Sequence, residues 1–301
     1  MANSTPTNSI RALLTEIIDY AGLFPPSALS MPEAVANYAA YKNSIYNWML
    51  GRFVLPVSRL DEFLESAKDF FPRDENNRWR LSVLASDNVD DTIRQIEDFN
   101  SANAASVVCD ALEVKAETSS RIETIVEKVP SDLKTYFEIP IGKNLGDLVS
   151  TLAIHKQRAK IRTGGVTVDA FPKNETIVRF MRTCLAANVP FKATAGLHHP
   201  LRCFNALTYQ TDAPEGAMNG FLNVFLAVGL LQQGYDSRLI FELLNDENAD
   251  NFVFNGEDVL WRQEHSISTA QLRRLREKNI ISFGSCSFDE PVFDLQEIEL
   301  L

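Results

Sequence analysis

Two lysines lie at equivalent places in two short segments of alternating polarity. Residues 159–165 read Ala-Lys-Ile-Arg-Thr-Gly-Gly, and residues 191–200 read Phe-Lys-Ala-Thr-Ala-Gly-Leu-His-His-Pro. Successive side chains of a strand point to opposite faces, so Lys160 shares a face with Arg162 while apolar residues occupy the other face. A bare charge is expensive to bury, so Lys160 and Lys192 on covered parallel strands must be paired or lie in a solvated cleft. We interpret them as cleft residues; the alternative is two solvent-facing lysines at a sheet edge.

A lysine among other cations and apolar walls has a lowered pKa and can attack a carbonyl carbon to form a Schiff base. A nearby carboxylate, for which Glu138 and Asp110 are the candidates, could move protons during that reaction. Glu138 would also oppose the chemistry if it lay beside Lys160, because it would raise the pKa of that amine. Arginines hold phosphate or carboxylate groups in bidentate fashion, so the residues predict a small anionic carbonyl substrate.

The elements that must position these residues alternate regularly between strand and helix. Residues 173–187 are amphipathic and join the two lysine segments into a βαβ unit of parallel strands. The same rhythm runs through the chain, with strands expected at residues 19–24, 49–56, 80–86, 105–112, 134–141, 159–165, 191–200 and 280–287.

Eight such units predict a single (β/α)8 TIM-type barrel over residues 1–301, since this fold usually takes about 250 residues. Residues 201–267 break the rhythm and predict a helical insertion between strands 7 and 8, with helices over 220–233 and 236–245. The alternative is an open doubly wound sheet, but the chain has no G-x-G-x-x-G or P-loop motif.

In such barrels the active site lies at the carboxyl ends of the strands. Polar residues at inward-facing or terminal strand positions are therefore the candidate site. The predicted catalytic residues are Lys160, Lys192, Glu138 and Asp110, and the predicted substrate-binding residues are Asp19, Arg52, Arg162, Thr163, Thr194, His198, His199, Gly284 and Ser285. The Gly-Ser-Cys-Ser loop over residues 284–287 could bind phosphate through its backbone N–H groups.

The adjacent pair His198-His199 raises the question of a metal site. Adjacent strand residues point to opposite faces, so both histidines rarely bind one ion. We predict no metal and a proton-transfer or substrate-binding role for one histidine. The alternative is a metal bound by one of the two together with Asp19 or Glu138.

Three motifs carry a resemblance to class I aldolases of the deoxyribose-phosphate aldolase type. Residues 160–164 (Lys-Ile-Arg-Thr-Gly) resemble the strand-six K-x-x-T-G of that family, residues 192–196 resemble its strand-seven lysine motif, and residues 284–287 are similar to its phosphate loop. The resemblance implies that Lys160 forms the Schiff base and that Lys192 lowers its pKa. The chain departs from the family pattern at Arg162, an added cation, and the family's strand-four aspartate has no clear match.

The amino-acid composition argues against several classes of binding partner. A formal charge of −11 argues against nucleic acid and anionic membrane surfaces. The four cysteines have no C-x-x-C spacing, and neither a leader pattern nor a membrane-spanning run is present, which favours a cytoplasmic protein. We expect an enzyme without a cofactor, and a homo-oligomer is left open. The alternatives are a non-Schiff-base isomerase, a metal-assisted hydrolase, or a barrel that binds an anionic metabolite without turnover.

Overall fold

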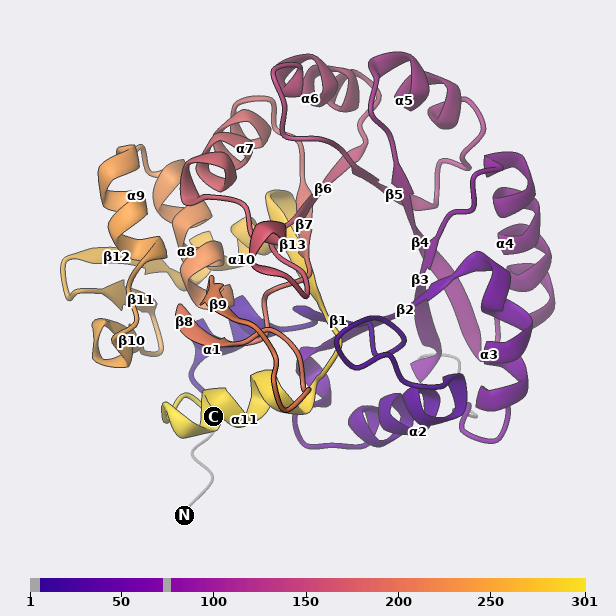
Figure 1. The fold of residues 1–301 in the computed structure, drawn as a ribbon, viewed down its shortest axis with the longest axis horizontal. Coiled ribbons are helices and arrows are strands. Elements are labelled where there is room, and N and C mark those ends of the chain that lie inside the picture. The colour runs from indigo at the N-terminus through magenta and orange to yellow at the C-terminus, as the bar shows by residue number, and fades with distance from the viewer. Residues whose placement is uncertain (1–5, 73–76) are drawn as a thin grey trace.

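The computed structural model describes residues 6–72 and 77–301, and its centre is a closed barrel of eight parallel strands (Figure 1). The strands follow one another around the barrel in chain order, as predicted, so the (β/α)8 fold is confirmed. The barrel consists of β1 (Ile18–Tyr20), β2 (Leu50–Pro56), β3 (Trp79–Leu84), β4 (Val107–Lys115), β5 (Lys134–Glu138), β6 (Arg158–Arg162), β7 (Phe191–Thr194) and β13 (Ile280–Ser285).

Helices surround the barrel, and several begin at side chains that cap them. The Ser30 hydroxyl and the Glu33 carboxylate form a reciprocal capping box at the start of α2, and Ser268 with Gln271 does the same for α10. The helices are α1 (Asn8–Leu14), α2 (Met31–Lys42), α3 (Leu60–Ala67), α4 (Val89–Asn103), α5 (Ser119–Val126), α6 (Leu145–Ile154), α7 (Asn174–Ala186), α8 (Phe221–Gln232), α9 (Ser237–Leu244), α10 (Thr269–Lys278) and α11 (Asp289–Glu297). None of the helices in the described part of the chain has the length and apolar character needed to cross a membrane.

The segment between β7 and β13 contains more strand than predicted. The start of the predicted helical insertion instead contains strand β8 (Cys203–Ala206), which forms a hairpin with β9 (Glu215–Met218). After α9, a three-stranded antiparallel sheet consists of β10 (Phe252–Phe254), β11 (Asp258–Trp261) and β12 (His265–Ser268). The prediction of a helical insertion is therefore only partly correct. The helix α8 packs directly against the barrel, because the ring of Phe221 stacks on that of Phe283 in β13, with the ring centroids 4.9 Å apart.

An irregularity in β4 decides which side chains enter the barrel. Leu81 pairs with Cys109, but the next residue of β3, Ser82, pairs with Ala111, so Asp110 is an extra residue in the ladder. A bulge of this kind shifts the alternation of inward and outward side chains. Asp110 and Glu113, three residues apart, consequently both contact partners inside the barrel.

Candidate active site

The two lysines lie directly opposite each other on neighbouring strands and share one carboxylate. Lys160 of β6 pairs in register with Lys192 of β7. Glu113 of β4 lies between their ammonium groups, with Oε2 2.7 Å from Lys160 Nζ and Oε1 2.7 Å from Lys192 Nζ. All three residues are buried, and burial of charges at this depth requires such pairing.

Lys192 is the more enclosed of the two lysines. Its Nζ also donates to Asp19 Oδ2 at 2.6 Å, and only 1% of its side chain is exposed. The second oxygen of Asp19 accepts the backbone N–H of Arg52 at 2.9 Å, and Ser282 Oγ donates to Asp19 Oδ2 at 2.7 Å. Burial by itself would lower the pKa of Lys192, but Asp19 and Glu113 outweigh it and raise that pKa above its usual value.

Lys160 also contacts the last residue of β5. Its Nζ is 2.8 Å from Glu138 Oε2, and 7% of the Lys160 side chain and 16% of the Glu138 side chain are exposed. The sequence predicted a lysine among cations, and this is wrong, because two carboxylates contact Lys160 and Arg162 is an exposed side chain at the end of β6. The ammonium groups of Lys160 and Lys192 can lie on adjacent strands because the Glu113 carboxylate lies between them.

Arg52 and Asp110 do not belong to this end of the barrel. Arg52 binds Asp110 in bidentate fashion, with Nε–Oδ1 at 2.5 Å and Nη2–Oδ2 at 2.6 Å, and Lys134, the first residue of β5, is 3.3 Å from Asp110 Oδ2. These contacts lie toward the amino-terminal ends of the strands. The structure therefore places Arg52 and Asp110 away from the carboxyl ends of the strands, where they were predicted to act on the substrate.

Three other predicted residues, Thr163, Thr194 and Gly284, lie at or near the carboxyl ends of β6, β7 and β13, which form the mouth of the barrel. Thr163 is fully buried and donates to the Ala195 carbonyl oxygen at 2.6 Å, so its hydroxyl is engaged within the protein. A Cβ on Gly284 would approach Thr194 Oγ1 to 3.1 Å, which places these two predicted residues side by side on paired strands. Thr163 is thus structural, while Thr194 and Gly284 line the same end of the barrel as Lys160.

The two histidines after β7 both pair with carboxylates of α11. His198 Nδ1 is 3.2 Å from Glu290 Oε2, and His199 Nδ1 is 2.5 Å from Asp294 Oδ2. His198 Nδ1 also lies 3.9 Å from Cys286 Sγ, in the loop predicted to bind phosphate. The two histidines therefore attach the loop after β7 to the helix after β13.

The contact between His198 and Cys286 shifts the pKa values of both side chains. Burial would disfavour a charged imidazole, but hydrogen bonds with Cys286 and Glu290 raise the pKa of His198 to about 10. Burial would raise the pKa of Cys286, and His198 more than compensates, so that pKa is lowered. Ser285 Oγ accepts the backbone N–H of Ser287 within the loop.

We expect the contribution of His198 to stability to depend on pH. Its pKa is raised on folding, so the stabilisation is complete below the unfolded value of about 6.5 and is lost as pH rises through 10. The difference in unfolding free energy between wild type and His198→Gln, measured by urea titration, should therefore shrink steadily from pH 6 to pH 10. His155→Gln, at the end of α6, is the control. A difference that stays constant over this range contradicts the charged pair.

The residue that the sequence analysis missed is Glu113. Counting by twos from Asp110 places Glu113 on the outer face of β4, whereas the bulge turns it inward between the lysines. The apolar neighbours Leu112 and Val114 gave no signal of a site. In the described ranges, no group of three or more His, Cys, Asp or Glu side chains is arranged to hold a metal ion.

Comparison with models of protein families and with curated proteins finds no match for this chain.

Proposed function

We propose that this chain is a barrel enzyme that acts on a small anionic carbonyl compound through Schiff-base lyase or aldolase chemistry. The observation that carries the proposal is the buried carboxylate of Glu113, which lies 2.7 Å from the ammonium groups of both Lys160 and Lys192. A carboxylate between two lysines fixes both amines at one point in the barrel, where Glu138 lies beside Lys160 and can take its proton. The resemblance of the two lysine segments to class I aldolases supports the same assignment.

Lys160 is the proposed nucleophile because its side chain is the more exposed of the two. Its contact with Glu138 favours the ammonium form, so Glu138 must accept the ammonium proton before the amine can attack. Glu138 takes a proton from the Lys160 ammonium, and the free amine adds to the carbonyl carbon. The carbinolamine then loses water to give an iminium ion. Cleavage of the bond between the α and β carbons sends its electron pair into the iminium to give an enamine, while a carboxylate accepts the proton of the β-hydroxyl group, whose oxygen becomes the carbonyl of the released aldehyde. Protonation of the enamine and hydrolysis of the iminium then release the second product and regenerate Lys160.

The other residues at this end have supporting roles in the proposal. Lys192 remains an ammonium between Asp19 and Glu113, in keeping with its raised pKa, and offsets part of their negative charge. Arg162, exposed at the end of β6, is the proposed contact for the anionic group of the substrate. Thr194 and Ser285 lie at the ends of the two following strands around the barrel and are the proposed hydrogen-bond partners.

Borohydride trapping tests the proposal. Incubation with pyruvate, acetaldehyde or glyceraldehyde 3-phosphate and borohydride should attach the reduced carbonyl compound to Lys160, as located by peptide mass spectrometry. Lys160→Met should abolish the adduct, whereas Lys115→Met, which removes an exposed lysine at the end of β4, should leave it intact. An absence of adduct with all three compounds, or equal labelling of Lys115 and Lys160, refutes the Schiff-base assignment.

A second candidate is an isomerase on the same barrel that uses no Schiff base. The contacts of Lys160 with two carboxylates favour it, because a paired ammonium can stabilise an enolate oxygen while Glu138 moves a proton. Solvent deuterium exchange at the carbon next to the carbonyl, without any borohydride adduct, would identify this chemistry.

A further inference from the structure

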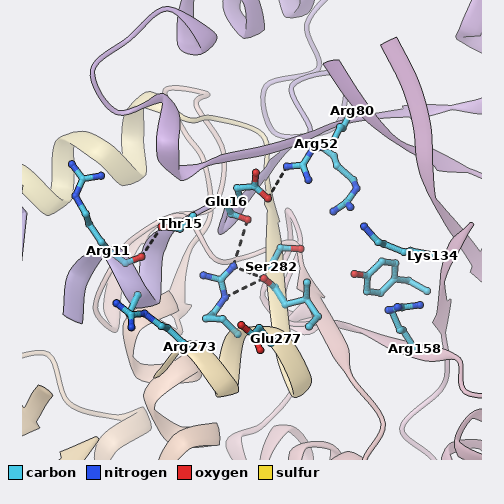
Figure 2. A pocket seen from close by; sticks show the side chains of 14 residues that line it. Arg11, Thr15, Glu16, Arg52, Arg80, Lys134, Arg158, Arg273, Glu277 and Ser282 are labelled. Atoms are coloured by element: carbon cyan, nitrogen blue, oxygen red, sulfur yellow. Dashed lines mark hydrogen bonds and ion pairs between the residues drawn. The ribbon is translucent and has the colours of Figure 1, made fainter. Parts of the chain in front are cut away.

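The opposite end of the barrel contains a cavity of about 540 Å³ that is lined mainly by cations. It lies at the amino-terminal ends of the strands, between α1, α10 and the first residues of β3, β5 and β6 (Figure 2). Seven arginine or lysine side chains line it against two glutamates, although the whole chain carries a formal charge of −11. Such a concentration of one sign in an acidic protein attracts anions.

Only part of this positive charge is neutralised within the protein. Arg80 pairs with Glu16 at 2.7 Å, and Arg52 and Lys134 share Asp110. Among the described residues, no carboxylate forms an ion pair with the other four cations of the cavity, which are Arg11, Arg158, Arg273 and Arg276.

The positive charge of Arg276 is held by hydrogen bonds to the protein backbone. Its guanidinium donates to the backbone carbonyls of Ile281, Leu13 and Glu16. Burial outweighs the attraction of nearby carboxylates and lowers the pKa of Arg276 to about 10, so the cation is poorly solvated there. Its charge is therefore held by backbone acceptors.

The cations form two walls. Figure 2 shows Arg11 and Arg273, from α1 and α10, on one side of the cavity, and Arg80, Lys134 and Arg158, from the barrel, on the other. The Arg158 guanidinium lies 5.9 Å from the centre of the Tyr136 ring, which keeps it oriented at the barrel wall. Glu16 and Ser282 lie between the two walls, and a phosphorylated ligand could contact the cations of either one.

From the cations that have no carboxylate partner in the described part of the chain we infer a second ligand site, which takes a small phosphorylated molecule. Arginine forks match phosphate oxygens in geometry, and the volume lies within the range of metabolite pockets. The site is separate from the mouth at Lys160, because the buried side chains of Asp19, Lys192 and Glu113 fill the barrel between them. It nevertheless touches the same network, since Ser282 lines the cavity and donates to Asp19.

Calorimetric titration of the full chain with pyrophosphate tests this inference. The titration should be run at ~0.15 M ionic strength, where weak surface attraction is screened. We expect saturable binding of one pyrophosphate, and weaker binding of orthophosphate because it carries less charge and fewer oxygens for the guanidinium groups. Arg158→Gln and Arg273→Gln, one from each wall, should each weaken pyrophosphate binding roughly tenfold or more.

Arg274→Gln is the matched control, because it removes the same charge from the exposed neighbour of Arg273 on α10 without altering the cavity lining. Arg273 is itself exposed, so its variant tests the site even if Arg158→Gln does not fold. No saturable binding, or equal weakening by Arg274→Gln, would overturn the inference. So would a loss of binding in Arg162→Gln alone, which would locate the anion at the mouth instead.

Discussion

Glu113→Gln should lower the free energy of unfolding by ~3–5 kcal/mol, the usual effect of removing one partner from a buried ion pair. The glutamine keeps the shape of the side chain but removes the negative charge that lies 2.7 Å from both Lys160 and Lys192. Lys192 would retain Asp19 and Lys160 would retain Glu138, but the two ammonium groups would then face each other without a carboxylate between them. Ser82 Oγ, which donates to Glu113 Oε1, would also lose a charged acceptor.

Chemical denaturation at pH 7 measures this effect. Glu117→Gln, an exposed substitution just beyond β4, makes the same chemical change and should alter stability by less than ~0.5 kcal/mol. The Glu113 variant should recover part of its loss at high pH, where a lysine can release its proton. If Glu113→Gln is no more destabilising than Glu117→Gln, the shared carboxylate does not hold the lysines together.

Acid should unfold the protein through the same buried carboxylates. The charged side chains of Lys192, Lys160 and Arg52 outweigh burial and lower the pKa values of Asp19, Glu113 and Asp110 in the folded state. A carboxyl with a lowered pKa stabilises the fold above its unfolded pKa of about 4, and this contribution is lost as pH falls through the folded value. Each unit of lowering corresponds to ~1.4 kcal/mol, so three such groups should give a steep decline in stability below pH ~4.

Unfolding free energies between pH 6 and pH 2 test this expectation. Asp19→Asn should be less stable than wild type at pH 6 and should lose less stability on acidification, because one of the three groups no longer titrates. Asp132→Asn, at an exposed position before β5, should follow the wild-type curve. Parallel curves for wild type and Asp19→Asn would show that Asp19 does not gain its stability from Lys192.

The sequence by itself was sufficient to predict the barrel. Alternating strand and helix patterns place all eight strands close to where the structure has them, and the spacing of the lysine segments predicts their pairing on adjacent parallel strands. These features are local, because strand periodicity and helix capping depend on residues that are near one another in the chain. The insertion was harder to predict, because its short strands β10, β11 and β12 pair only with one another and carry little periodic signal.

Only the tertiary structure decided the charges inside the barrel. The bulge at Asp110 turns Glu113 inward, and a one-residue change in register reverses every later side chain, which no composition or motif reveals. Arg52 lies on the predicted strand yet pairs with Asp110 at the opposite end from the predicted mouth. The cationic cavity brings together side chains from α1, α10 and five barrel strands. Those contacts form between residues far apart in the chain, so their energetics depend on distances that exist only once the barrel has closed.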